Sequence, residues 1–179
     1  MRTKIFLTAV LLAVGLGCGA QTVSLSTNML DYANLGTLNL DASFSVARHW
    51  SLGAGVKYNP FTYRQQSYSL SARYWPWHVY SGWWVSGNMR YQEYNTGGYT
   101  TWKYADEQTS EGDRYGGGIA GGYTYMLARN FNLDFGIGVW AGYDVFITYA
   151  CPHCGRIVDS GRKFFVLPSN LSLSLSYLF

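Results

Sequence analysis

The stretch LSLSLSYLF, residues 171–179, alternates apolar and serine side chains and ends on an aromatic residue. Successive side chains of a β-strand point to opposite faces. One face therefore carries Leu171, Leu173, Leu175, Tyr177 and Phe179, and the other carries Ser172, Ser174 and Ser176. The stretch predicts a strand with one apolar face and one polar face.

This ending resembles the closing strand of a bacterial outer-membrane β-barrel. In such barrels the terminal aromatic residue is recognised by the barrel-assembly machinery. The resemblance implies that Tyr177 and Phe179 form a C-terminal assembly signal. It also implies that the solvent of this chain is lipid.

The N-terminus has the parts of a secretory signal peptide. A basic start and an apolar run at residues 5–16 precede the small-residue site Cys18-Gly19-Ala20. Cleavage after Ala20 would leave residues 21–179 as the barrel domain. Lipidation of Cys18 is an alternative, although Gly15 stands where lipoprotein signals favour leucine.

Alternation with a period of two runs through the remaining chain in eight segments. We expect strands at residues 22–32, 38–47, 50–59, 67–77, 83–94, 115–127, 130–149 and 164–179. Eight strands make the smallest common membrane barrel, so we predict an all-β, eight-stranded antiparallel transmembrane β-barrel of the outer-membrane type. A soluble, tyrosine-rich β-sandwich is the structural alternative.

Composition and link lengths favour the membrane barrel. Aromatic residues make up 18% of the chain, and aromatic girdles flank the lipid-facing band of such barrels. The second and sixth links are tight, whereas the fifth and seventh, about residues 95–114 and 150–162, are long. Short periplasmic turns and longer external loops are the usual arrangement. No basic patch indicates a nucleic-acid partner.

Six charged residues are expected to face the lumen on this register. They are Asp41, Lys57, Arg73, Arg90, Asp134 and Asp144. An eight-stranded lumen is just wide enough for side chains to fill, and buried charges persist when paired. We therefore expect a packed ion-pair network. A narrow path for protons or small ions is the alternative.

Two of the expected external loops carry further candidate residues. The fifth link holds an acidic group, Asp106, Glu107, Glu111 and Asp113. We interpret it as a solvated external loop, with a patch for divalent cations or a cationic partner as the alternative.

The seventh link holds the sequence Cys151-Pro152-His153-Cys154, which is similar to the active site of periplasmic thiol oxidases. That chemistry needs a helix after the first cysteine, and no helical pattern follows. We expect a disulfide between Cys151 and Cys154 instead. Zinc is a weaker option because only three ligands are present.

Catalysis is not expected. None of the histidines, His49, His78 and His153, is placed beside a serine and a carboxylate on an outer strand face, as an acyl hydrolase would need. We therefore predict no catalytic residue, no metal site and no cofactor.

Several segments together resemble a family of small Bacteroidota outer-membrane barrels of unknown function. They include TNMLDYANLGTLNLDAS, ARHWSLGAGVKYNPF, LSARYWPW, the glycine-rich run from residue 115, CPHCG and the ending YLF. Members often lie beside genes for fimbrillin-type surface proteins. The resemblance implies a membrane barrel and gives no activity.

We therefore expect a non-enzymatic protein of the outer membrane with a structural or adhesion-related role, as an accessory to surface fibres, acting through its external loops. The expected partners are outer-membrane lipid, the barrel-assembly machinery and a surface or fimbrial protein. A narrow ion or solute channel and an enzyme that modifies lipid A are the alternative functions.

Overall fold

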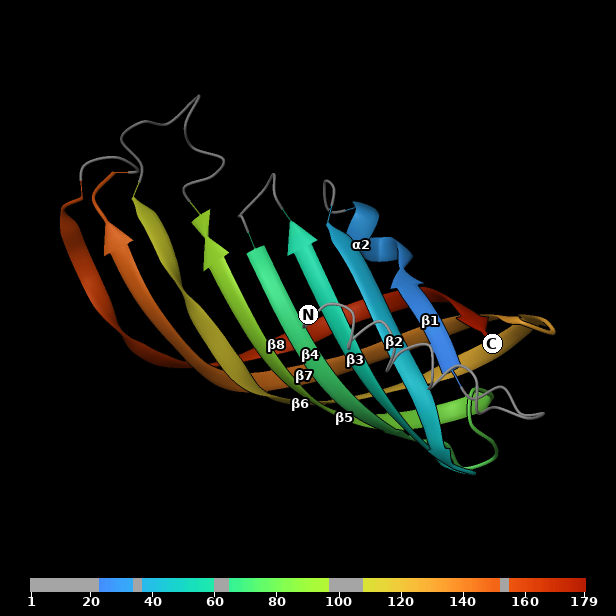
Figure 1. Ribbon diagram of the computed structural model, residues 1–179. Helices are drawn as coiled ribbons and strands as arrows, with labels where there is room; N and C mark the ends of the chain where they lie inside the picture. The colour runs from blue at the N-terminus through green and yellow to red at the C-terminus, as the bar shows by residue number, and fades with distance from the viewer. Residues whose placement is uncertain (1–22, 34–36, 60–64, 97–107, 152–154) are drawn as a thin grey trace, which may run out of the picture.

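The computed structural model describes residues 23–33, 37–59, 65–96, 108–151 and 155–179 (Figure 1). These residues form a closed antiparallel barrel in which each strand pairs with the next and β8 pairs with β1. The strands are β1 (Val23–Asn28), β2 (Leu38–Ala47), β3 (Trp50–Asn59), β4 (Gln65–Tyr74), β5 (Gly82–Asn95), β6 (Thr109–Ala128), β7 (Phe131–Tyr149) and β8 (Ile157–Leu178), and the one short helix is α2 (Met29–Ala33). The predicted all-β barrel of eight antiparallel strands is confirmed.

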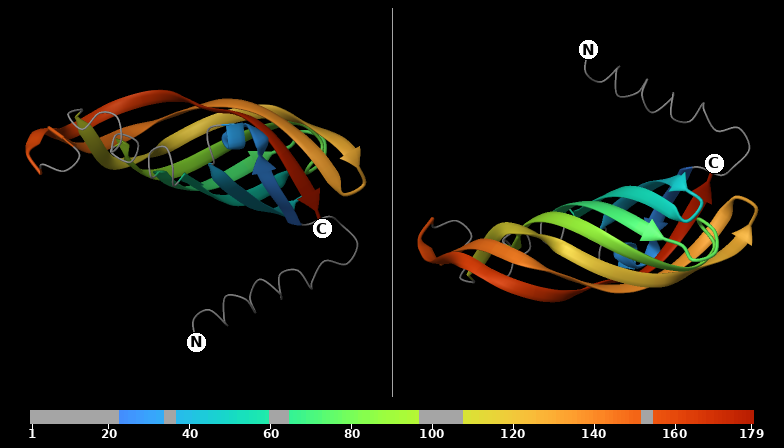
Figure 2. Two further views of the ribbon diagram at one scale, coloured as in Figure 1. Left: turned by 90° about the horizontal axis from the view of Figure 1, so that it is seen from above. Right: turned by 90° about the horizontal axis from the view of Figure 1, so that it is seen from below.

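Two ends of the barrel can be distinguished. The turn end carries the C-terminus, the β2–β3 and β6–β7 turns and the β4–β5 link, residues 75–81 (Figures 1 and 2). The loop end carries the other four links. The predicted signal peptide, residues 1–20, lies outside the described residues. Within the described part of the chain, no helix has the length and apolar character needed to cross a membrane.

The first strand is shorter than its alternation predicts. We expected it to continue to residue 32, but β1 ends at Asn28 and α2 begins at the next residue. The Asn28 side-chain carbonyl accepts hydrogen bonds from the backbone N–H of Leu30 at 3.2 Å and of Leu173 at 3.0 Å. These bonds satisfy one donor of the first helical turn and one donor of β8, and the strand ends there.

Two other strands begin well before their predicted starts. β6 begins at Thr109 and β8 at Ile157, because residues expected in loops pair with β7, with one register shift beside Tyr149. Polar and glycine residues interrupt the apolar alternation in these extensions, which hid them. β5 is one residue longer at each end than predicted, and β4 ends at Tyr74 and not at residue 77. The three strands β6–β8 have 20, 19 and 22 residues, against six to ten for β1–β4. One wall of the barrel therefore rises above the other at the loop end (Figure 1).

The interior of the barrel is polar and its exterior is apolar. Buried inward positions are mostly serine, threonine, asparagine, glutamine and aspartate, as at Ser51, Ser86, Asn132 and Asp144. Large aliphatic side chains point outward, and Leu70 and Ile119 remain 64% and 66% exposed. This distribution is the reverse of that in a soluble domain.

Outward-facing aromatic residues form two rows. The row nearer the loop end is Tyr68, Tyr91, Tyr115, Tyr143 and Phe164, which follow one another in register across β4–β8. The row nearer the turn end includes Trp50, Tyr74, Trp83, Tyr123, Phe131 and Tyr177. On β6, Tyr115 of one row and Tyr123 of the other are eight residues apart. This separation is about 26 Å along the strand, and about 20 Å along the barrel axis if the strands are tilted by about 40°.

Candidate functional site

The six charged residues predicted for the lumen all lie inside the barrel. Five of them, Asp41, Lys57, Arg73, Arg90 and Asp134, line lumen cavities, and Asp144 is fully buried. The period-two alternation of their strands places them there, because each sits between outward apolar neighbours. Among these six residues, only Arg73 and Asp134 form an ion pair with each other.

Asp144 on β7 is the centre of the first cluster. Its Oδ2 accepts a hydrogen bond from Arg114 Nε at 3.1 Å and lies 3.5 Å from Lys163 Nζ. Its Oδ1 accepts a hydrogen bond from the Tyr94 hydroxyl at 2.9 Å. The Arg114 guanidinium also lies 4.1 Å from the centroid of the Tyr94 ring. Sequence reasoning missed Arg114 and Lys163 because both fall in the strand extensions that were expected to be loops.

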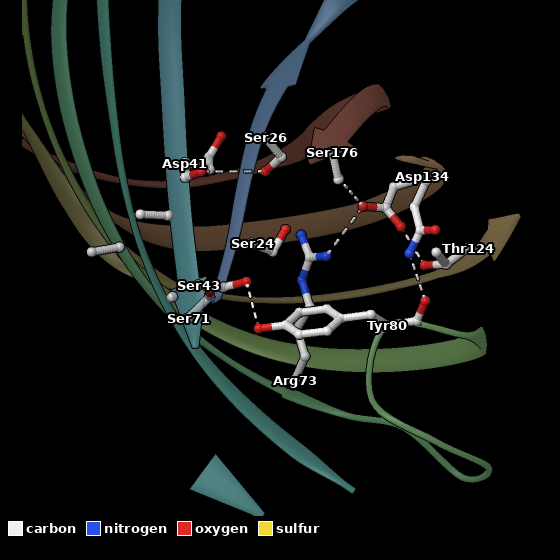
Figure 3. A pocket seen from close by; sticks show the side chains of 14 residues that line it. Ser24, Ser26, Asp41, Ser43, Ser71, Arg73, Tyr80, Thr124, Asp134 and Ser176 are labelled. Atoms are coloured by element: carbon white, nitrogen blue, oxygen red, sulfur yellow. Dashed lines mark hydrogen bonds and ion pairs between the residues drawn. The ribbon is translucent and has the colours of Figure 1, made fainter. Parts of the chain in front are cut away.

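Asp134, also on β7, holds the second cluster (Figure 3). It accepts a short hydrogen bond from the Thr124 hydroxyl and another from the Ser176 hydroxyl at 2.8 Å. Arg73 Nη1 lies 3.9 Å from its Oδ2, and the Arg73 guanidinium stacks 4.4 Å from the Trp84 ring centroid. Side chains from β4, β6 and β8 thus contact one carboxylate of β7 inside the lumen.

A fourth ion pair joins α2 to the barrel wall. Lys57 Nζ lies 2.6 Å from Asp31 Oδ2, and both side chains are largely buried. Asp31 was not among the predicted lumen charges, because its segment was expected to continue as a strand. The turn of helix instead directs its carboxylate to the lumen.

Asp41 and Arg90 take part in no ion pair among the described residues. The Asp41 carboxylate occupies space left by Gly55 on the neighbouring strand, where an added Cβ would collide with Asp41 Oδ1. The Arg90 guanidinium lies 5.2 Å from the Trp140 ring centroid, and its buried Nε has no hydrogen-bond partner. Four of the six predicted residues are therefore ion-paired and two are not.

Aromatic side chains close the lumen at the turn end. Trp75, Tyr80, Trp84 and Leu178 form a buried cluster, with Trp75 only 1% exposed. The Trp75 indole N–H donates to the Ser51 hydroxyl at 3.0 Å. The Asn132 side-chain amide donates to the Tyr80 backbone carbonyl at 2.8 Å. The β4–β5 link therefore folds back into the barrel as a plug.

The plug was not predicted from the sequence. In the structure, the backbone of Tyr80 is held in an unusual conformation. Tyr80 has a φ of 64°, in the left-handed region that a bulky residue adopts only when its surroundings hold it. Burial also raises the pKa of the Tyr80 phenol, which stays protonated as a hydrogen-bonding group near Ser43. The run of aromatic residues from Trp75 to Trp84 was the available indication.

Three cavities follow one another along the lumen. The first, about 30 Å³, lies beside Tyr80 and Arg73 (Figure 3). The second, about 110 Å³, shares Arg73 and Asp41 with the first and reaches Arg90 and Lys57. The third, about 220 Å³, shares Arg90 and Lys57 with the second and reaches Arg114. Polar space thus extends from the plug toward the loop end.

The predicted external acidic loop is wrong for two of its four residues. Glu111 and Asp113 lie on β6, where they face outward. Glu111 accepts hydrogen bonds from the Tyr149 hydroxyl at 2.8 Å and the Asn95 amide at 3.0 Å. Asp113 accepts one from the Tyr91 hydroxyl at 3.1 Å. Asp106 and Glu107 lie outside the described residues.

Of the remaining predicted residues, Cys151 lies at the loop end, and Tyr177 and Phe179 lie at the turn end. Cys154 and His153 are outside the described residues, so the disulfide with Cys151 remains a prediction. No group of three or more His, Cys, Asp or Glu within the described ranges could hold a metal ion. At the turn end, the Phe179 N–H donates to the Val23 carbonyl at 2.9 Å, and the Tyr177 and Phe179 rings pack edge to face with centroids 4.8 Å apart.

Comparison with known proteins gives a family without an assigned activity. A family model described as "Protein of unknown function (DUF3575)" matches residues 5–179. No curated protein and no solved structure matches the chain.

Proposed function

The chain belongs to the DUF3575 family, and from that premise we propose that it is an integral outer-membrane barrel that does not conduct and acts at its loop end. Its role is structural or adhesion-related, as an accessory to surface fibres, and not enzymatic. The link to fibres rests only on the family resemblance of the sequence. The fold and the lumen support the rest.

The reversed distribution of side chains carries the proposal. An apolar band lies between the two aromatic rows on the outside, while buried inward positions are polar. Soluble monomers rarely expose apolar patches above a few hundred Å². In lipid the same surface is stabilised, and a closed barrel leaves no backbone edge to satisfy. A spacing of about 20 Å between the rows suits the outer membrane, which is thinner than average.

The closed turn end argues against the channel alternative. Trp75, Tyr80 and Trp84 fill the lumen there, and the clusters around Asp134 and Asp144 cross it further along. A barrel of eight strands has little space beyond its own side chains. In a barrel that does not conduct, we assign binding of partners to the surface at the loop end. The taller wall of β6–β8 supports that surface.

Heat modifiability tests the membrane assignment. We expect the protein to fractionate with the outer membrane and, after extraction in mild detergent, to migrate faster on a denaturing gel unboiled than boiled. A closed barrel resists the detergent until heating opens its strand ladder. A soluble periplasmic protein that shows no shift would contradict the proposal and favour the β-sandwich.

Single-channel recording separates the non-conducting barrel from the channel. Purified, heat-modifiable protein in planar bilayers is expected to give no conductance steps above the lipid baseline, because aromatic side chains close the turn end. A porin inserted in the same bilayers serves as the positive control. Reproducible steps from this protein would support the channel in place of the surface role.

A further inference from the structure

The cavity nearest the loop end is lined by positive charges. Lys57, Arg90 and Arg114 come from β3, β5 and β6 and line this space of about 220 Å³, the vestibule. No carboxylate is among its described lining residues, which otherwise are Gln65, Ser67, Gln92, Trp140, Leu167 and Pro168. Clefts lined by one sign of charge within low-dielectric walls concentrate ions of the opposite sign.

Arg90 is the cation of the vestibule that lacks a partner. Lys57 pairs with Asp31 and Arg114 pairs with Asp144, whereas Arg90 has no ion pair among the described residues. The buried Nε of Arg90 has no hydrogen-bond partner within the described part of the chain. Asp41 lines the adjoining cavity with Arg90 but is not within ion-pair distance of it. A buried cation is costly unless it is paired, so the vestibule is short of one anion.

The charges around the vestibule leave it positive. Four cations, Lys57, Arg90, Arg114 and Lys163, lie in or beside it, against the three carboxylates of Asp31, Asp41 and Asp144. Trp140 is 4% exposed and lies under the Arg90 guanidinium, with 5.2 Å to its ring centroid. Stacking on this fixed ring restricts the guanidinium and reduces the entropy lost when it binds.

We propose that the vestibule binds the phosphate group of a small soluble phosphorylated molecule. A guanidinium matches the geometry of phosphate and binds it with two parallel hydrogen bonds. The volume equals that of about seven water molecules in the liquid, which accommodates a phosphate and part of a small organic group. The strands separate the vestibule from lipid, so the ligand comes from the aqueous side. This inference depends on the barrel fold and not on the proposed surface role.

Glucose 6-phosphate is a suitable probe, with glucose as the uncharged comparison. Calorimetric titration into detergent-solubilised, heat-modifiable protein at low salt is expected to detect glucose 6-phosphate and not glucose. Loss of charge-assisted hydrogen bonds in Arg90→Gln should weaken binding about tenfold or more. Added sodium chloride should weaken binding to the wild type, because ions screen the attraction.

Arg162→Gln is the matched control. Arg162 is also an arginine near the loop end, but it lies over the outward rings of Tyr115 and Tyr143. Its substitution should leave binding unchanged, and Arg90→Lys should retain part of it. Each variant is first checked for heat-modifiable migration. Absence of binding to folded wild type, or equal binding by folded Arg90→Gln, would overturn the inference.

Discussion

Replacement of Asp144 by alanine is expected to lower the free energy of unfolding of the barrel by about 3–5 kcal/mol, the usual cost of breaking a buried ion pair from one side. The side chain is fully buried and serves Arg114, Lys163 and the Tyr94 hydroxyl at once. Its removal leaves two cations facing each other and one hydroxyl without its acceptor. Unfolding in urea, followed by the loss of the heat-modifiable band, measures the change.

Asp113→Ala provides the matched comparison for Asp144→Ala. Asp113 is an exposed aspartate on the neighbouring strand and accepts a hydrogen bond from Tyr91. Solvent and salt screen such a group, so its loss should change the free energy of unfolding little. Asp144→Asn keeps two acceptor or donor positions and should fall between alanine and wild type. Equal stability of the Asp113 and Asp144 alanine variants would show that the cluster does not hold the lumen together.

The parts of the fold that follow strict alternation could be predicted from the sequence. The bounds of β2 and β3 agree with the structure, since their apolar and polar residues alternate without interruption between clear turns. The same alternation assigned six lumen charges to the inside. Side-chain direction is a local property of a strand, so no tertiary information was needed.

The parts that depend on contacts distant in sequence could not be predicted. The end of β1 is set by hydrogen bonds that the Asn28 side-chain carbonyl accepts from Leu30 in α2 and from Leu173 in β8, the latter 145 residues away. Gly136 gives space to the Trp84 ring, where an added Cβ would lie 2.8 Å from it. The plug and the partners of Asp144 depend on such cross-lumen packing. Local periodicity does not indicate which residues distant in sequence become neighbours.

Replacement of Phe179 by alanine is expected to deplete the assembled barrel from the membrane while leaving the folded barrel almost as stable. The Phe179 ring is 53% exposed and its aromatic contact is with Tyr177, so its loss should cost about 1 kcal/mol or less. The backbone bond from the Phe179 N–H to the Val23 carbonyl, which helps to close β8 on β1, is kept in alanine. Assembly in the cell differs, because before closure β8 is an unpaired edge whose recognition would use the terminal ring.

The two readouts are the amount of heat-modifiable protein in the outer-membrane fraction and the urea stability of protein refolded in detergent. Leu171→Ala is the control, because Leu171 is an outward apolar residue of the same strand, 65% exposed, that leaves the terminus intact. We expect Phe179→Ala to lose membrane protein and Leu171→Ala to keep it, with similar stabilities in detergent. Wild-type levels of the Phe179 variant would contradict the assembly signal, and a large loss of stability in detergent would assign its ring to barrel packing instead.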